Sequence, residues 1–74
     1  MWQEKNDELF RSFSFKDFKT ALDFVNKVGA LAESANHHPD IELSWGKVGV
    51  HLSTHNEGGV TQKDKRLAKE IDKI

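Results

Sequence analysis

Histidine is the residue type in this chain that is best suited to chemistry near neutral pH. Three of the four histidines, His37, His38 and His55, fall where regular elements are expected to end. An unperturbed imidazole has a pKa of about 6.5, so both its acid and its base form are populated near neutrality. Catalytic side chains are commonly presented at the ends of rigid elements. These residues therefore indicate proton transfer, although a single histidine at a helix end is more often a cap for the last carbonyls.

Two carboxylates are placed to support these imidazoles. Glu33 precedes His37 by four residues, so on one helix face it could orient that imidazole or hold a donor group of a substrate. A solvated helix charge is the simpler alternative. Asp64 follows Thr61 by three residues, which is the spacing of a capping box. The capping role and a role in the site are compatible.

Other kinds of site find little support. His51 alternates with apolar residues and is expected on the outer face of a sheet, without a catalytic role. Metal binding is not expected, because the adjacent His37 and His38 cannot easily face one ion, and His51 and His55 have a helical ligand spacing on an expected strand. Gly58-Gly59 lacks the other residues of a nucleotide-binding loop, and the absence of Cys removes a thiolate nucleophile.

The composition describes the scaffold that must position these groups. The 74 residues, 36% hydrophobic and 31% charged, fit a single domain over residues 1–74. Because 11 basic residues meet 12 acidic ones, no net field favours nucleic acid or an anionic membrane. No Cys and no long apolar run are present, and the start lacks a signal-peptide pattern, so a cytoplasmic location is expected. A domain this small buries only about 60% of its unfolded surface, so self-association is also expected.

A long helix is predicted before the double histidine. Residues 14–17 have the pattern of a capping box with Ser14 as the cap. Apolar residues then recur at steps of three and four, which predicts one core-facing stripe. Its members are Phe15, Phe18, Leu22, Val25, Val28, Leu31 and Ala32. The helix should end near residue 35 or 36, because Asn36 tolerates the left-handed conformation and Pro39 disfavours helical dihedrals at His38.

Period-two alternation predicts two hairpins on either side of that helix. The hairpin with the weaker sequence pattern joins residues at about 2–6 and 8–13 through a turn around Asn6-Asp7. The second joins residues 41–45 and 48–52 through Gly46-Lys47 as a two-residue turn. This register pairs Trp45 with Val48, Leu43 with Val50 and Ile41 with Leu52, all on one face.

A last helix follows the capping box at Thr61. Its apolar face comprises Leu67, Ala68, Ile71 and Ile74. The order of elements is then strand-strand-helix-strand-strand-helix. It predicts an α+β fold in which a four-stranded antiparallel sheet has its helices packed on one face.

The residues singled out above also follow one another at fixed distances. Glu33-x-x-x-His37-His38-Pro39 is followed by Trp45, His55 and Asp64, with Ser53-Thr54 before His55 and Gly58-Gly59 before Asp64, and Leu9-x-Arg11-x-Phe13-x-Phe15 leads into the long helix. Together these positions span nearly the whole chain. The pattern resembles the pterin-4a-carbinolamine dehydratase family.

The resemblance implies both a fold and a hydro-lyase activity. The fold would be the α+β arrangement above, without the extra N-terminal helix of many relatives, assembled as a homodimer or homotetramer. The reaction would be dehydration of 4a-hydroxytetrahydropterin, the biopterin form included, to quinonoid dihydropterin, which recycles the cofactor of aromatic amino acid hydroxylases. No redox cofactor or metal would be required, since the pterin is the substrate. By position, His37 and His55 would be the proton-transfer pair, His38 would hold and orient the pterin, and Glu33 and Asp64 would support binding.

Two other functions are compatible with the same resemblance. Animal relatives also act as dimerisation partners of a homeodomain transcription factor, so a dimeric coactivator-type binding module is one alternative. A dehydratase-like protein acting on the pterin of molybdenum-cofactor metabolism is the other. Asn36 and Lys63 stand where Asp and Arg are frequent in the family. These departures weaken the expectation that these two side chains contact the pterin.

Overall fold

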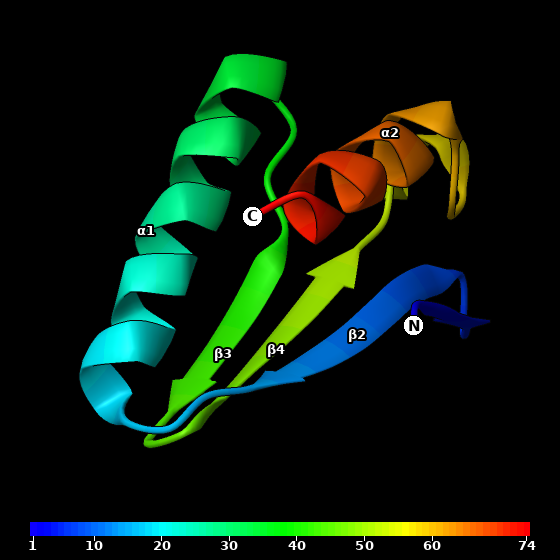
Figure 1. Ribbon diagram of the computed structural model, residues 1–74. Helices are drawn as coiled ribbons and strands as arrows, with labels where there is room; N and C mark the ends of the chain where they lie inside the picture. The colour runs from blue at the N-terminus through cyan, green and yellow to red at the C-terminus, as the bar shows by residue number, and fades with distance from the viewer.

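The computed structural model describes residues 1–74 and contains one antiparallel sheet and two α-helices. The strands are β1 (Gln3–Lys5), β2 (Glu8–Ser14), β3 (Asp40–Ser44) and β4 (Lys47–Leu52), in the spatial order β1-β2-β4-β3. Helices α1 (Phe18–Ala35) and α2 (Gln62–Asp72) lie on the same side of the sheet (Figure 1). The predicted α+β fold and order of elements are therefore confirmed.

One hydrophobic core joins the helices to the sheet. Its members come from one position of β2, from alternating positions of β4 and from one face of each helix, as period-two and helical patterns require. They are Leu9, Ala21, Phe24, Val28, Val48, Val50, Leu52, Leu67, Ala68 and Ile71. The opposite face of the sheet has no helix over it (Figure 1). Neither helix combines the length and the hydropathy that crossing a lipid bilayer requires.

The predicted start of the long helix was wrong, and its predicted core-facing stripe was right only in part, because Val28 and Ala32 are buried and Phe15, Val25 and Leu31 pack against the core. Asp17, not Ser14, caps α1, because its carboxylate accepts from the amide and the hydroxyl of Thr20 at 2.8 and 2.7 Å. Ser14 is the last residue of β2, where it pairs with Lys47. The helix buries Ala21, Phe24, Val28 and Ala32, whereas Phe18 and Leu22 of the predicted stripe are 46% and 38% exposed.

An aromatic cluster explains this choice of face. The ring of Phe24 lies 4.7 Å from that of Phe13 and 5.0 Å from that of Phe15, measured between centroids. Such contacts stabilise a pair of rings by about 0.5–1.5 kcal/mol beyond the burial of their area. The cluster turns Phe24, which the predicted stripe omitted, toward the sheet.

The register of the second hairpin also differs from the prediction. Trp45 and Gly46 form the turn, so Leu43 pairs with Val48 and Ile41 with Val50. The predicted turn needs a positive φ at Gly46, but only Gly58 and Gly59 have one among the glycines. The pairing of β3 with β4 is shifted by two residues from the prediction, so the apolar residues still lie on the predicted face of the sheet. Trp45 lies outside the strands and is 69% exposed.

Gly46 is required by a close approach of backbone segments. The Phe15 amide donates to the Gly46 carbonyl at 2.8 Å, and a Cβ at residue 46 would lie 2.9 Å from the Phe15 carbonyl oxygen. Only glycine fits without a shift of the backbone. This contact fixes the turn against the segment that leads into α1.

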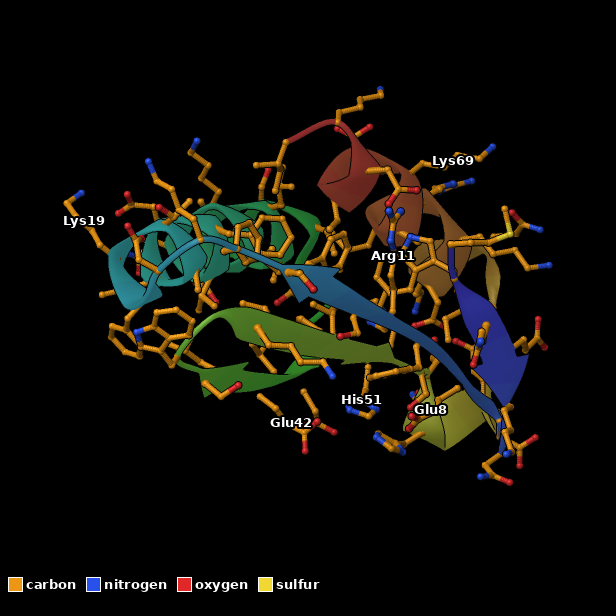
Figure 2. All side chains as sticks on the ribbon, turned by 60° about the horizontal axis from the view of Figure 1, so that its bottom comes forward. Glu8, Arg11, Lys19, Glu42, His51 and Lys69 are labelled. Atoms are coloured by element: carbon orange, nitrogen blue, oxygen red, sulfur yellow. The ribbon has the colours of Figure 1, made fainter.

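His51 lies on the uncovered face of the sheet, as predicted. Figure 2 shows it between Glu8 and Glu42, pointing away from the helices. Its Nδ1 is 2.5 Å from a Glu8 carboxylate oxygen and its Nε2 is 3.1 Å from one of Glu42. Both nitrogens can donate only when the imidazole is protonated. The hydrogen bond to Glu8 therefore raises the pKa of His51, against the opposing effect of burial.

This contact predicts a pH dependence of folding stability. Because folding raises the pKa of His51, its stabilisation is fully present below the unfolded value of about 6.5 and is lost as pH rises through the folded value. The free energy of unfolding, measured with urea at several pH values above 6, should therefore fall more steeply for the wild type than for His51→Gln. Parallel curves for the two proteins would contradict a stabilising contact of protonated His51 with Glu8 and Glu42.

The antiparallel pairing of β3 with β4 determines where the site forms. Asp40 at the start of β3 pairs with His51 near the end of β4. The segment before β3 and the segment after β4 therefore lie at the same end of the sheet. His38 precedes β3 and His55 follows β4, so one hairpin brings both toward each other.

Candidate active site

A polar cleft of about 460 Å³ opens at this end of the sheet. Its walls come from the residues between α1 and β3, the segment after β4 and the start of α2. They are Asn36, His37, His38, Ser53, Thr54, His55, Asn56 and Lys63. The three histidines that the sequence singled out thus line one cleft.

The end of α1 holds His37 in place. Asn36 closes the helix in the predicted left-handed conformation, with φ 50° and ψ 42°. The amide of His37 then donates to the carbonyl of Ala32 at 3.1 Å, which completes the helix end. The backbone of His37 is therefore fixed by the helix, although its side chain lies beyond it.

The imidazole of His37 is bound to a buried carboxylate. Its Nε2 lies 2.6 Å from Oδ1 of Asp64, which belongs to the first turn of α2 and is fully buried. The His37 side chain itself is only 14% exposed. A residue far along the chain therefore orients this histidine.

Asp64 accepts hydrogen bonds from three donors. Besides His37, the hydroxyl of Thr54 and the amide of Thr61 each donate to Oδ2 at 2.8 Å. The second of these bonds completes the predicted capping box of α2, which is confirmed. Burial by itself would raise the pKa of Asp64, but the donors from His37, Thr61 and Thr54 outweigh it and hold the pKa below its ordinary value.

The ionised state of Asp64 defines the tautomer of His37. A carboxylate can only accept, so Nε2 of His37 carries the hydrogen in the 2.6 Å contact. Neutral His37 is then unprotonated at Nδ1. Nδ1 is therefore the nitrogen that can accept a proton.

His38 and Glu33 form a separate pair. Nε2 of His38 lies 2.5 Å from a carboxylate oxygen of Glu33, and both side chains are exposed. The sequence spacing had suggested that Glu33 orients His37, but the structure pairs it with His38 instead. The reason is that His37 and His38 lie beyond the end of α1, where helical spacing no longer applies.

His55 is presented by a short 3-10 helix, His55–Glu57, directly after Thr54. A backbone bridge between Thr54 and Gly59 closes this segment, with bonds of 2.8 and 3.3 Å. The imidazole is exposed, and its Nε2 lies 3.3 Å from the Ser53 hydroxyl. His55 is therefore open to the cleft and to solvent, in contrast to the nearly enclosed His37.

The structure places the five predicted site residues in two groups. His37, His38 and His55 line the cleft, whereas Asp64 and Glu33 do not line it and contact His37 and His38, respectively. Because Asp64 is fully buried, it has no direct access to a ligand, and His37 is the cleft residue that it contacts.

Thr54 was not singled out as a site residue from the sequence, although a signal was present. It continues the alternation of Val48, Val50 and Leu52 on the core-facing side of β4. A hydroxyl at such a position must find buried hydrogen-bond partners. That requirement points to the network around Asp64.

Comparison with known proteins identifies the family of this chain. A family model described as "Pterin 4 alpha carbinolamine dehydratase" matches residues 1–74. A Picosynechococcus protein named "Putative pterin-4-alpha-carbinolamine dehydratase" is 51% identical over 73 residues, which cover 99% of this chain and 79% of the relative.

Solved structures share the fold. The crystal structure of a "transcriptional coactivator/pterin dehydratase" from Brucella melitensis matches with a TM-score of 0.90 at 38% identity, over 96% of this chain and 78% of that chain. A "pterin dehydratase-like protein", described as a RuBisCO assembly factor in the alpha-carboxysome, matches with a TM-score of 0.81 at 24% identity, over 96% and 84% of the two chains, which shows the fold alone. The family model matches every residue of the chain, and the Picosynechococcus relative is identical to it at about half of the aligned positions. This chain therefore belongs to the pterin-4-alpha-carbinolamine dehydratase family.

Proposed function

We propose that the protein is a hydro-lyase that dehydrates 4a-hydroxytetrahydropterin to quinonoid dihydropterin, with His37 and His55 as the proton-transfer pair. Family membership supports a pterin dehydratase-like function. The observation that carries the finer proposal is the geometry of His37, whose Nε2 is committed to the buried Asp64. This leaves one imidazole with a defined basic nitrogen in a cleft that also contains His55.

The reaction needs one proton acceptor and one proton donor. The proton on N5 of the pterin is removed, the N5 electron pair forms a double bond to C4a, and the C4a–oxygen bond breaks as the hydroxyl receives a proton and leaves as water. In the proposal Nδ1 of His37 accepts from N5, and protonated His55 donates to the hydroxyl. Solvent then returns a proton to His55, which is exposed, and His37 releases its proton into the cleft that both histidines line.

The remaining cleft residues would bind the substrate. His38, supported by Glu33, would hold and orient the pterin ring. The hydroxyl of Ser53 and the side chains of Asn56 and Lys63 add polar groups to the walls. A pterin carries several ring donors and acceptors, which these polar side chains can bind.

A direct assay tests this proposal. Freshly generated 4a-hydroxytetrahydropterin decays spontaneously, so its loss is followed by absorbance with and without the protein. The wild type is expected to accelerate the decay, with water and quinonoid dihydropterin as products. A decay rate that is independent of protein concentration would remove the proposed activity. A cytoplasmic location and the identity of the physiological pterin stay predictions.

Self-association is a second proposal, and apolar residues on α1 support it. Phe18 and Leu22 are separated by one helical turn, so they share a face, and both are exposed. We propose that a second copy of the chain covers this face, as expected for a domain with so small a core. The same face would serve a coactivator-type role, a description that the Brucella structure carries beside pterin dehydratase.

The substitution Leu22→Glu tests the self-association. A charge at a buried apolar contact should weaken association at least about tenfold, since burial of one leucine stabilises by about 1.5–3 kcal/mol. Light scattering after size-exclusion chromatography measures the oligomer at several concentrations. Lys27→Glu places a carboxylate at an exposed position of α1 that lies about 140° around the helix from Leu22, and it serves as the control. A monomeric wild type, or an unchanged oligomer in Leu22→Glu, would contradict the proposal.

A further inference from the structure

Thr54 has a polar side chain in an apolar setting. It is 4% exposed and follows the buried residues of β4 on the core-facing side. An interior hydroxyl without partners destabilises a protein by about 1–3 kcal/mol, so its contacts are expected to be specific. Its oxygen lies 2.8 Å from Oδ2 of Asp64 and 2.9 Å from Oγ1 of Thr61.

The direction of these hydrogen bonds follows from counting hydrogens. The hydroxyl of Thr54 has one hydrogen, and the carboxylate of Asp64 can only accept it. In the contact between the two hydroxyls, Thr61 must therefore be the donor and Thr54 the acceptor. The result is a one-way chain from Thr61 through Thr54 to Asp64.

This chain fixes the rotation of the Asp64 carboxylate. Two donors, the Thr54 hydroxyl and the Thr61 amide, hold Oδ2 on one side. Oδ1 is then directed at Nε2 of His37. The terminal torsion of an aspartate is intrinsically broad, so the donors rather than the side chain itself determine this orientation.

Thr54 also fixes the segment that carries His55. Its amide donates to the Gly59 carbonyl at 2.8 Å, and its carbonyl accepts from the amides of Glu57 and Gly59 at 2.9 and 3.3 Å. One residue therefore binds the carboxylate behind His37 with its side chain and the turn of His55 with its backbone.

We propose that Thr54 is a positioning residue of the site, whose hydroxyl sets the orientation of Asp64 and through it the tautomer and ring position of His37. The effect on turnover rests on the proposed function, whereas the effect on the tautomer does not. Thr54 touches no reacting atom in this proposal. Its loss acts through Asp64 and His37.

The matched pair Thr54→Val and Thr54→Ser tests the hydroxyl. Valine keeps the branched shape and removes the donor, while serine keeps the donor. Thr54→Val is expected to lower kcat by about tenfold or more with KM changed less than about threefold, the range typical of groups that orient a functional histidine. Thr54→Ser should stay within about twofold of the wild type.

Thr20→Val serves as a control for the loss of a hydroxyl in general. The Thr20 hydroxyl also donates to a carboxylate, that of Asp17, but at the start of α1 and outside the cleft. This variant is expected to keep wild-type kcat. A loss of turnover in Thr20→Val equal to that in Thr54→Val would assign the effect to stability and overturn the positioning role.

A spectroscopic measurement separates this proposal from the proposed function. Nitrogen-15 NMR of the histidine rings reports which nitrogen carries the hydrogen. Neutral His37 should be protonated at Nε2 in the wild type and in Thr54→Ser. In Thr54→Val only the Thr61 amide still holds Oδ2, so the carboxylate can turn away from Nε2 of His37, and neutral His37 should show a mixture of both tautomers. If the wild type does not accelerate pterin decay, the dehydratase proposal fails and this measurement still decides the role of Thr54.

Two results would overturn the positioning role. One is a wild-type His37 protonated mainly at Nδ1, which can be measured without any variant. The other is a Thr54→Val protein with wild-type tautomer and wild-type kcat. If Thr54→Val does not fold, Thr54→Ala removes the same donor without new packing, and the same two readouts apply to it.

Discussion

Replacement of His55 or His37 by alanine should lower kcat by about 10²- to 10⁴-fold, the range that general acid–base catalysis supplies. His55→Ala is the cleaner of the two variants, because the side chain is exposed and its loss leaves no buried group unpaired. His37→Ala removes one of three donors from a fully buried carboxylate. It should therefore also lower the free energy of unfolding, by about 1–3 kcal/mol.

The decay assay with purified variants measures this effect, and circular dichroism with urea unfolding checks the fold. His51→Gln is the matched control, because His51 also contacts two carboxylates but lies on the uncovered face of the sheet (Figure 2). It should keep wild-type turnover. Normal turnover in both single alanine variants and in the double variant would contradict the proton-transfer roles.

Asp64→Asn should have an effect on kcat of similar size, about 10²-fold or more, although the residue touches no ligand. Thr54 and Thr61 donate to one side of the Asp64 carboxylate and would keep an oxygen there. The amide nitrogen of asparagine would then face Nε2 of His37 and donate to it. This forces the hydrogen of neutral His37 onto Nδ1 and abolishes the basic nitrogen that the proposal requires.

Two measurements check this prediction. The decay assay at neutral pH gives kcat, and nitrogen-15 NMR gives the tautomer of His37, which should change from Nε2–H to Nδ1–H. Asp72→Asn is a suitable control, since Asp72 is bound to Trp2 and Arg11 near the other end of α2. An Asp64→Asn protein within twofold of wild-type kcat would show that the tautomer of His37 does not govern the reaction.

Asp64 also gives stability a lower pH limit. Because folding lowers its pKa, its contribution is fully present above the ordinary value of 3.8 and is lost as pH falls through the lower, folded value. The loss thus begins only in acid, far from neutral pH. His51 acts in the opposite direction, with a contribution that is lost as pH rises through its raised, folded pKa.

Much of the fold follows from short-range chemistry that is visible in the sequence. Asn6 and Asp7 both adopt positive φ, which suits a tight two-residue hairpin turn, and Asn36 closes α1 in the left-handed conformation. Thr61 begins α2 with a capping box. Each of these features depends on residues only a few positions apart, so a single sequence suffices to predict it.

The errors of sequence reasoning arose where distant residues decide. The side of α1 that packs on the sheet depends on the contact of Phe24 with Phe13 and Phe15. The register of the second hairpin depends on the close approach of Gly46 to Phe15. Periodicity within one element carries no information about either contact.

The sequence by itself determined which side chains are available for chemistry and that His37, His38 and His55 stand just beyond regular elements. The tertiary structure alone decided their partners. Glu33 binds His38 and not His37, and Asp64 reaches His37 across 27 residues of sequence. These pairings arise because the docking of α2 against the end of α1 buries a carboxylate, and a buried carboxylate is retained only where donors from separate segments converge on it.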